Sequence, residues 1–343
     1  MAKTTFSTSD ALTKKLWDEK LYRDAEKESY FKKFMGKSKD SAVYVKEELT
    51  KSKGDEITFG LRMRLTGAGV TGNTTLEGNE ERLTTHSDSV VLERYRHAVR
   101  DDGELSRQRA MFSIDEESKD ALSNWMTEKI DELCFDAIQT TFTRYVYRDG
   151  GSTGAFAQTG TESTAKGALS ATYKITPDFL VELKTYAKTG GNRSFIPIRP
   201  IPVMGKKYYV LLVHDDILAD LLKDDDFQSA QKEAYQRSDD HPIFKDSVAI
   251  FRGVVVHCHE NMHIGTDAGG GGNVAWGKGI LLGAQGLCWA WGQRPKTVQK
   301  KFDYDEEHGF ATSITAKAKK PQFNSEDYGT LGVYLPRTQI SDL

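Results

Sequence analysis

The chain has 343 residues, of which 38% are hydrophobic and 10% aromatic, enough for one large or two ordinary globular domains rather than a disordered protein. The net charge of -3 and a pI near 6.3 argue against a general nucleic-acid binder. Three cysteines without C-x-x-C spacing, Cys134, Cys258 and Cys288, indicate a reducing cytosol and small buried side chains. The longest apolar run, residues 280–291, is interrupted by glycine and too short to span a bilayer, so we expect no membrane association.

Residues 10–35 place apolar side chains at roughly helical spacing, and Gly36 offers a stop. The other faces of this segment are charged, so the apolar stripe is narrow. That pattern predicts a helical arm laid over a neighbouring surface. Residues 37–54 lose the periodicity, which predicts a linker.

Strict alternation of apolar and polar residues begins at Ile57 and predicts a strand over residues 57–66. A second β-rich run covers residues 90–99, and the segment 66–89 between them is rich in Gly, Thr, Asn and Glu. We expect the two runs to pair as a long ribbon with an open, polar tip. A two-stranded ribbon is marginal alone in water, so another subunit is expected to stabilise it.

Arginine replaces lysine throughout this stretch. No lysine occurs between Lys53 and Lys119, although the chain has thirty lysines and seventeen arginines. Guanidinium is planar, weakly hydrated and able to bind carboxylates in a bidentate way, which suits contacts with another protein surface. The bias predicts a docked surface that carries eight arginines: Arg62, Arg64, Arg82, Arg94, Arg96, Arg100, Arg107 and Arg109.

A capping box at residues 113–116 opens a helical pattern that continues for about thirty residues, to Tyr145. Residues 149–167 have the composition of a loop. Residues 173–294 then predict a compact α+β lobe, and the tail 297–335 returns to strands. The predicted elements of the lobe are helices at 179–188, 217–222 and 227–237, a strand at 208–213 and a hairpin at 248–259. Because the long helix offers an apolar face without another partner, we expect the tail strands to return and cover it.

One catalytic motif deserves weighing. His259, Glu260 and His263 match H-E-x-x-H, which in zinc peptidases lies on a helix so that both histidines reach one metal ion. Here the motif continues the β run 254–256, and a strand does not bring these side chains together. The interpretation as a polar strand end is favoured, and the chain has neither a G-x-S-x-G nor a Walker loop. We therefore expect no enzyme activity, no cofactor and no metal.

The order of parts resembles the major capsid protein of tailed phages, and particular segments resemble the coat-protein family of N-four-like podoviruses. These segments are KLWDEKLY at 15–22, LEGNEE at 76–81, RHAVR at 96–100, QR at 108–109, RGVVVH at 252–257 and LLGAQ at 281–285. The resemblance runs from about residue 10 to the C-terminus. It implies an α+β fold of the Hong Kong 97 type.

The resemblance implies four parts: an N-arm at 1–53, an E-loop at 54–112, a P-domain with a spine helix at 113–172 and 295–343, and an A-domain at 173–294. It implies a coat protein that assembles into hexamers and pentamers of an icosahedral head around double-stranded DNA. Expected partners are the protein itself, a portal, possible scaffold or decoration proteins, and DNA bound non-specifically, in a virion made in the host cytoplasm. The expected subunit interface includes Arg62, Arg64, Leu76, Glu77, Arg82, Arg94, Arg96 and Arg100.

Two departures from relatives sharpen these expectations. Some relatives join subunits through an E-loop lysine in an isopeptide bond, and this E-loop has no lysine. Others carry a long N-terminal scaffolding segment, whereas this arm begins near Met1, so a separate scaffold or decoration protein is expected. Hinges are expected at residues 37–53 and 101–103. The alternatives are an encapsulin-like shell with an enzyme cargo and, less favoured, a zinc peptidase.

Overall fold

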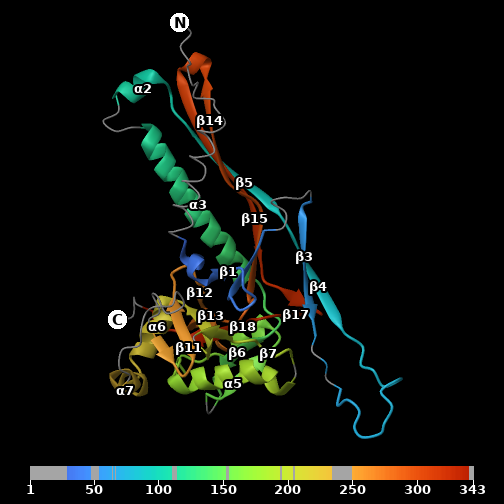
Figure 1. Ribbon diagram of the computed structural model, residues 1–343. Coiled ribbons are helices and arrows are strands. Elements are labelled where there is room, and N and C mark those ends of the chain that lie inside the picture. The colour runs from blue at the N-terminus through green and yellow to red at the C-terminus, as the bar shows by residue number, and fades with distance from the viewer. Residues whose placement is uncertain are drawn as a thin grey trace.

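The computed structural model describes residues 29–47, 54–63, 65, 67–109, 114–151, 154–193, 195–203, 205–233 and 249–339. The predicted arm helix lies mostly outside these residues, as does Arg64. Figure 1 shows a lobe of sheet and helices at one end, with a long helix and long strands that rise from it. A separate ribbon descends on the right of the picture, beside the lobe. No helix among the described residues is long and apolar enough to cross a membrane.

The rising part combines helix α3 (Ile114–Ile138) with a five-stranded sheet in the order β1-β2-β14-β15-β5. Its strands are β1 (Met35–Gly36), β2 (Val43–Lys46), β14 (Leu287–Phe302), β15 (Glu307–Lys319) and β5 (Glu93–Arg100). The buried side of α3, including Met126 and Ile130, shares one core with Trp289, Trp291 and Ile314 of the sheet. The tail strands therefore cover the long helix, as the sequence predicted.

The lobe is built on a second sheet, in which the described residues form nine strands in the main order β10-β11-β9-β13-β18-β6-β7, with β12 beside β13 and β8 beside β9. Alternate residues of β9 face two different cores, so both faces are covered. Its strands are β6 (Tyr145–Arg148), β7 (Phe156–Thr159), β8 (Ile201–Val203), β9 (Lys206–Val213), β10 (Ala249–Phe251), β11 (Val254–Cys258), β12 (Ile264–Ala268), β13 (Val274–Leu282) and β18 (Thr330–Pro336).

Helices α5 (Pro177–Arg193) and α6 (Asp215–Leu222) contribute apolar side chains to the core on one face of this sheet. Thr176 Oγ1 accepts a hydrogen bond from the Phe179 amide at 3.4 Å, which caps the start of α5. The backbone turns left-handed at Gly190 and Gly191, within the last residues of α5, which ends at Arg193 rather than at the predicted residue 188. The remaining short elements are η1 (Tyr30–Phe34), α2 (Glu104–Arg109), α4 (Glu162–Gly167), α7 (Asp225–Glu233), η3 (Asp303–Asp305), β16 (Gln322–Phe323) and β17 (Glu326–Asp327).

The ribbon consists of β3 (Glu56–Arg62) and β4 (Thr85–Val91), and its composition corrects one prediction. The run 90–99 was expected to be the second strand of the ribbon. Instead the chain breaks at Leu92, and β5 pairs with β15 in the five-stranded sheet. The alternation continues across the break, but the sheet changes, because Tyr95 and His97 turn toward α3.

Three other predictions were wrong in extent. Residues 149–167, expected as a loop, contain β7 and α4, because β7 pairs with β6 and Ala165 is buried. Residues 37–54, expected as a linker, contain β2, which pairs with β14 in a parallel register that leaves no sign in local sequence. The long helix ends at Ile138 rather than near 145, since Tyr145 already belongs to β6.

The predicted domain boundaries are crossed by the larger sheet. β6, β7 and β18, from the predicted P-domain, lie in the same sheet as β9, β11 and β13 of the predicted A-domain. The division into four parts therefore stays a prediction about mechanical units.

Two buried lysines fix the end of α3 to both sheets. Lys278 Nζ donates to the Gln139 carbonyl at 2.6 Å, and Lys320 Nζ donates to the Thr141 carbonyl at 2.8 Å. Both ammonium groups lie near the Phe142 ring, and Lys320 forms an ion pair with Asp327 at 3.1 Å. Burial lowers the pKa of Lys278 to about 8. Both carbonyls belong to the segment that follows the last turn of α3, so the two ammonium groups satisfy buried backbone acceptors where the chain leaves the helix.

Candidate assembly surfaces

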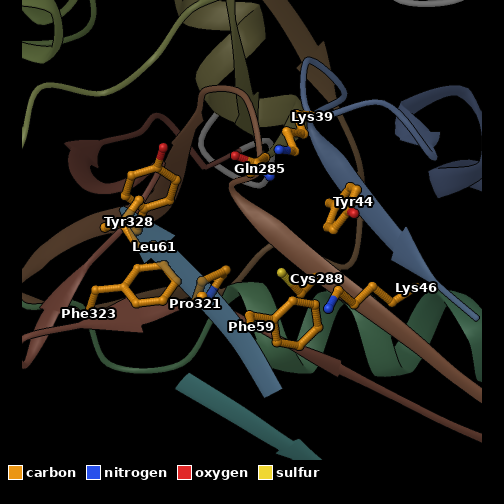
Figure 2. Close-up of a pocket in the computed structure, with 11 residues that line it drawn as sticks. Lys39, Tyr44, Lys46, Phe59, Leu61, Gln285, Cys288, Pro321, Phe323 and Tyr328 are labelled. Atoms are coloured by element: carbon orange, nitrogen blue, oxygen red, sulfur yellow. The ribbon is translucent and has the colours of Figure 1, made fainter. Parts of the chain in front are cut away.

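The base of the ribbon packs against the body of the protein. Ile57, Phe59 and Val90 join Cys288 and Ala290 of β14 in a small core. A cavity of about 200 Å³ lies beside them, between β2, β3 and residues 321–328, and Figure 2 shows Phe59 and Cys288 at its wall. Lys46 also ties β2 to β3, since its Nζ donates to the Thr58 carbonyl at 3.2 Å and lies 4.9 Å from the centre of the Phe59 ring.

Asp88 clamps the other ribbon strand. Its Oδ1 accepts from Lys319 Nζ at 2.6 Å, and its Oδ2 accepts from the Gln322 amide at 3.0 Å. The same ammonium donates to the Ser89 carbonyl at 2.6 Å. These charge-assisted bonds hold β4 against the end of β15.

Beyond this base the ribbon stands away from the lobe. A groove of about 1030 Å³ separates Met63 and His86 of the ribbon from Phe195 and Arg199 of the lobe and from Tyr328. The tip that follows exposes leucines at 52 to 62% of their surface: Leu65, Leu76 and Leu83. Their exposure on a projecting loop makes the tip a candidate contact surface.

The structure places the predicted interface arginines in two groups. Arg62 and Arg82 lie on the ribbon and its tip, whereas Arg94, Arg96 and Arg100 lie on β5. Arg100 pairs with Glu307 and stacks on Phe302 within its own chain. The other four side chains are exposed and form no ion pair with another described residue. The positions of Arg64 and of the Arg107 and Arg109 side chains lie outside the described residues.

The sequence predicted that the H-E-x-x-H segment is not helical, and the structure confirms this. It spans the turn between β11, which ends at Cys258, and β12, which begins at Ile264. The His259 ring contacts Tyr30 at 4.5 Å and Phe135 at 4.4 Å between ring centres. Among the described residues, the side chains whose ligand atoms converge as a metal site would need are Asp101, Asp115 and His308, far from this motif in sequence. The motif therefore belongs to a packing site.

That packing site anchors the N-terminal segment, a role that sequence reasoning missed. Asp131 of α3 accepts from Ser29 Oγ at 2.6 Å and from the Tyr30 amide at 2.9 Å, so it caps η1. Phe31 and Phe34 are buried behind it. Burial lowers the pKa of His259, while Asp131, Glu260 and Asp215 oppose that shift. A polar strand end and a lone helix carboxylate carry no local signal of such a contact.

These features describe a body with an anchored arm and a projecting ribbon. The sequence profile described as phage capsid protein matches residues 5–334. The chain belongs to the phage capsid protein family. Its role is accordingly structural rather than enzymatic, which excludes the zinc peptidase interpretation.

Individual relatives agree. The chain is similar to the "Major capsid protein" of Pseudomonas phage KPP25, with 28% identity over 97% of both chains. Among solved structures, the capsid of Ralstonia phage GP4 aligns with a TM-score of 0.77, at 23% identity and 99% coverage of both chains. The capsid of cyanophage Pam1 aligns with a TM-score of 0.75, at 20% identity and coverage of 98% and 99%. These likenesses confirm the predicted Hong Kong 97-type α+β fold.

Replacing Asp88 by asparagine should loosen the ribbon of this capsid-family protein. The substitution removes the ion pair with Lys319, whose loss we expect to cost roughly 1–3 kcal/mol of local stability. Hydrogen exchange should rise over residues 56–62 and 85–91 and stay unchanged in β9. Asp178→Asn, at an exposed helix start, is the matched control; equal protection of the ribbon in both variants would contradict the clamp.

Acid should weaken the anchor of the N-terminal segment. A folded pKa below the ordinary value means that the folded protein binds the proton less readily, so stability is present above about pH 6.5 and is lost as the pH falls. His259→Phe keeps an aromatic ring between Tyr30 and Phe135 but cannot titrate. Urea unfolding at pH 7.5 and 5.5 should show a larger loss for the native protein than for the variant. Equal losses would rule out His259 as the titrating group.

Proposed function

We propose that this chain is a major capsid protein that assembles into hexamers and pentamers of an icosahedral phage head around double-stranded DNA. The observation that carries this proposal is correspondence over 97% of both chains with a phage major capsid protein. The projecting ribbon with exposed leucines supports it, because a free subunit gains nothing from such a surface.

The four predicted parts then have mechanical roles. The E-loop, residues 54–112, and the N-arm, residues 1–53, overlap neighbouring subunits, while the lobe of the A-domain gathers at the capsomer axes and α3 with its sheet forms the floor. Quasi-equivalent positions require small changes of contact, which mobile connections absorb. Residues 101–103 are the better hinge, since β2 ties part of 37–53 into a sheet.

The hinge has a specific backbone requirement. Gly103 has a φ of +102°, and a Cβ there would lie 2.9 Å from the Glu306 carboxylate.

Further partners in this proposal are a portal, possible scaffold or decoration proteins and packaged DNA, in a virion made in the host cytoplasm. Since residues 54–118 contain no lysine, the shell holds together without isopeptide links from the E-loop.

The purified full-length protein should form closed shells or capsomer sheets. Electron microscopy and analytical ultracentrifugation over a range of concentrations test this directly. A monodisperse monomer at high concentration would overturn the proposal. Shells that copurify with a folded enzyme and lack any affinity for a portal would instead support the encapsulin-like alternative.

The arginines of the E-loop should be needed for their shape as well as their charge. Arg62→Lys combined with Arg94→Lys and Arg96→Lys keeps the charge but removes bidentate binding. We expect a folded subunit with a several-fold higher critical concentration for assembly, measured by light scattering. The exposed Arg252→Lys, outside this stretch, is the control. Unchanged resistance of the triple-variant shells to salt and heat would contradict the role.

A further inference from the structure

The sheet that carries α3 has a second face with a basic platform. Tyr95 and His97 of β5 face α3, where they meet Lys129 and Trp125. Successive residues of a strand point to opposite faces, and registered partners on antiparallel strands share a face. Three rows across β5, β15 and β14 therefore point away from α3: Arg96, Ser313 and Lys296; Ala98, Ala311 and Val298; Arg100, Gly309 and Lys300.

The platform has an apolar centre and charged sides. Val298 is 39% exposed in the middle row, between the cations of the outer rows. Arg96, Lys296 and Lys300 are exposed and form no ion pair with other described residues. The opposite face is covered by α3, whose charge is mainly negative, with eight carboxylates and two lysines. On the platform face, which no described element covers at this end of the sheet, three cations thus have no ion pair with a described residue, while the fourth, Arg100, pairs with Glu307 of the same face.

The ribbon tip has the complementary chemistry. The Asn79 amide donates to the Leu76 carbonyl at 3.0 Å and closes a turn, in which Gly78 has a φ of +87°. Leu76 is 62% exposed, and Glu77 beside it is exposed and has no ion pair with a described residue. Glu80 accepts from the Gly78 amide at 2.9 Å and holds the turn.

The tip is also preformed. Glu81 accepts from the Gly67 amide at 2.6 Å, which closes the loop across its width. A turn held in this way loses little conformational freedom on docking. It presents one leucine with carboxylates beside it, the pattern that an apolar centre between cations accepts.

The tip and the platform of one chain cannot meet. Figure 1 shows the tip at the far end of the ribbon, beyond β3 and β4, whereas the long strands β14, β15 and β5 run to the opposite end of the molecule. A contact between them has to join two copies.

We propose that the tip turn, residues 76–81, of one subunit docks on the basic platform of a neighbouring subunit. Leu76 covers Val298 and the alanines beside it, while Glu77 and Glu80 meet the cations of the outer rows. This inference rests on the proposed function and names the partner surface of the E-loop. Apolar burial supplies cohesion, and the charges set register and exclude wrong pairings.

Charge exchange tests the pairing. Glu77→Lys with Glu80→Lys, and separately Arg96→Glu with Lys296→Glu, should each slow shell assembly at least tenfold by light scattering. The four substitutions together should restore assembly to within a few-fold. Because Glu80 supports the turn, Glu77→Lys alone is also measured and should act in the same direction. Glu128→Lys, on the exposed side of α3, is the charge-matched control, and circular dichroism checks folding.

The outcomes separate this inference from the proposed function. If the native protein forms shells and the variants assemble equally well, the docking is wrong and the proposed function stands. Loss of assembly in both pairs without rescue in the combination also overturns the pairing. If the Arg96 and Lys296 variant assembles normally but loses affinity for a 30-base-pair duplex, the platform binds a polyanion instead. If the native protein forms no shell, the proposed function fails first.

Discussion

The fold depends on burying one helix face against two sheets at once. The apolar side of α3 reaches Trp289 and Trp291 in the five-stranded sheet, and the same continuous core runs on to Val210 and Leu212 in the larger sheet. Neither sheet could be rigid relative to the other without this shared core, because interiors of native packing density transmit strain rather than absorb it. Lys278 and Lys320 extend the same connection with hydrogen bonds to carbonyls just after the end of α3. The two sheets and α3 therefore form one body, to which the ribbon is attached.

The ribbon and the N-terminal segment are attached to the body in similar ways. The ribbon is fixed at its base by a small core and by Asp88, and its tip is free of the lobe across a wide groove. The N-terminal segment is fixed at η1 by Asp131 and by the aromatic contacts of His259. Each part thus has a defined point of attachment to the body, and the tip of the ribbon lies apart from the lobe. A subunit that reaches neighbours at slightly different angles needs that combination.

Sequence patterns predicted the elements whose information is local. Alternation from Ile57 predicted the first ribbon strand, and helical spacing predicted α3, while the cap residue Ser113 lies outside the described residues. The change from the ribbon to the five-stranded sheet at Leu92 was not predicted, because alternation of apolar and polar residues does not show which strand lies beside another. The parallel strand β2 was not predicted for a similar reason, since its partner β14 is more than two hundred residues away in the chain.

For the assembly surfaces the same division holds. Composition identified the arginine-rich stretch, and helical geometry rejected the metal motif, because both arguments need only neighbouring residues. The anchors formed by Asp88 and Asp131 could not be predicted, since each carboxylate accepts hydrogen bonds from donors that are distant in the sequence.

The absence of lysine from the E-loop has a physical consequence for how a shell would form. Where the E-loop supplies no isopeptide link, its cohesion has to come from many contacts that are individually weak, since exposed ion pairs contribute about 0–1 kcal/mol each. Such contacts open and close, so a subunit in the wrong place can leave before its neighbours fix it. Once several contacts form together, the effective concentration of each remaining one is high and the assembly becomes stable. Exposed leucines on a preformed tip, with cations on a sheet face that no described element covers, are therefore suited to a shell that corrects its errors before it closes.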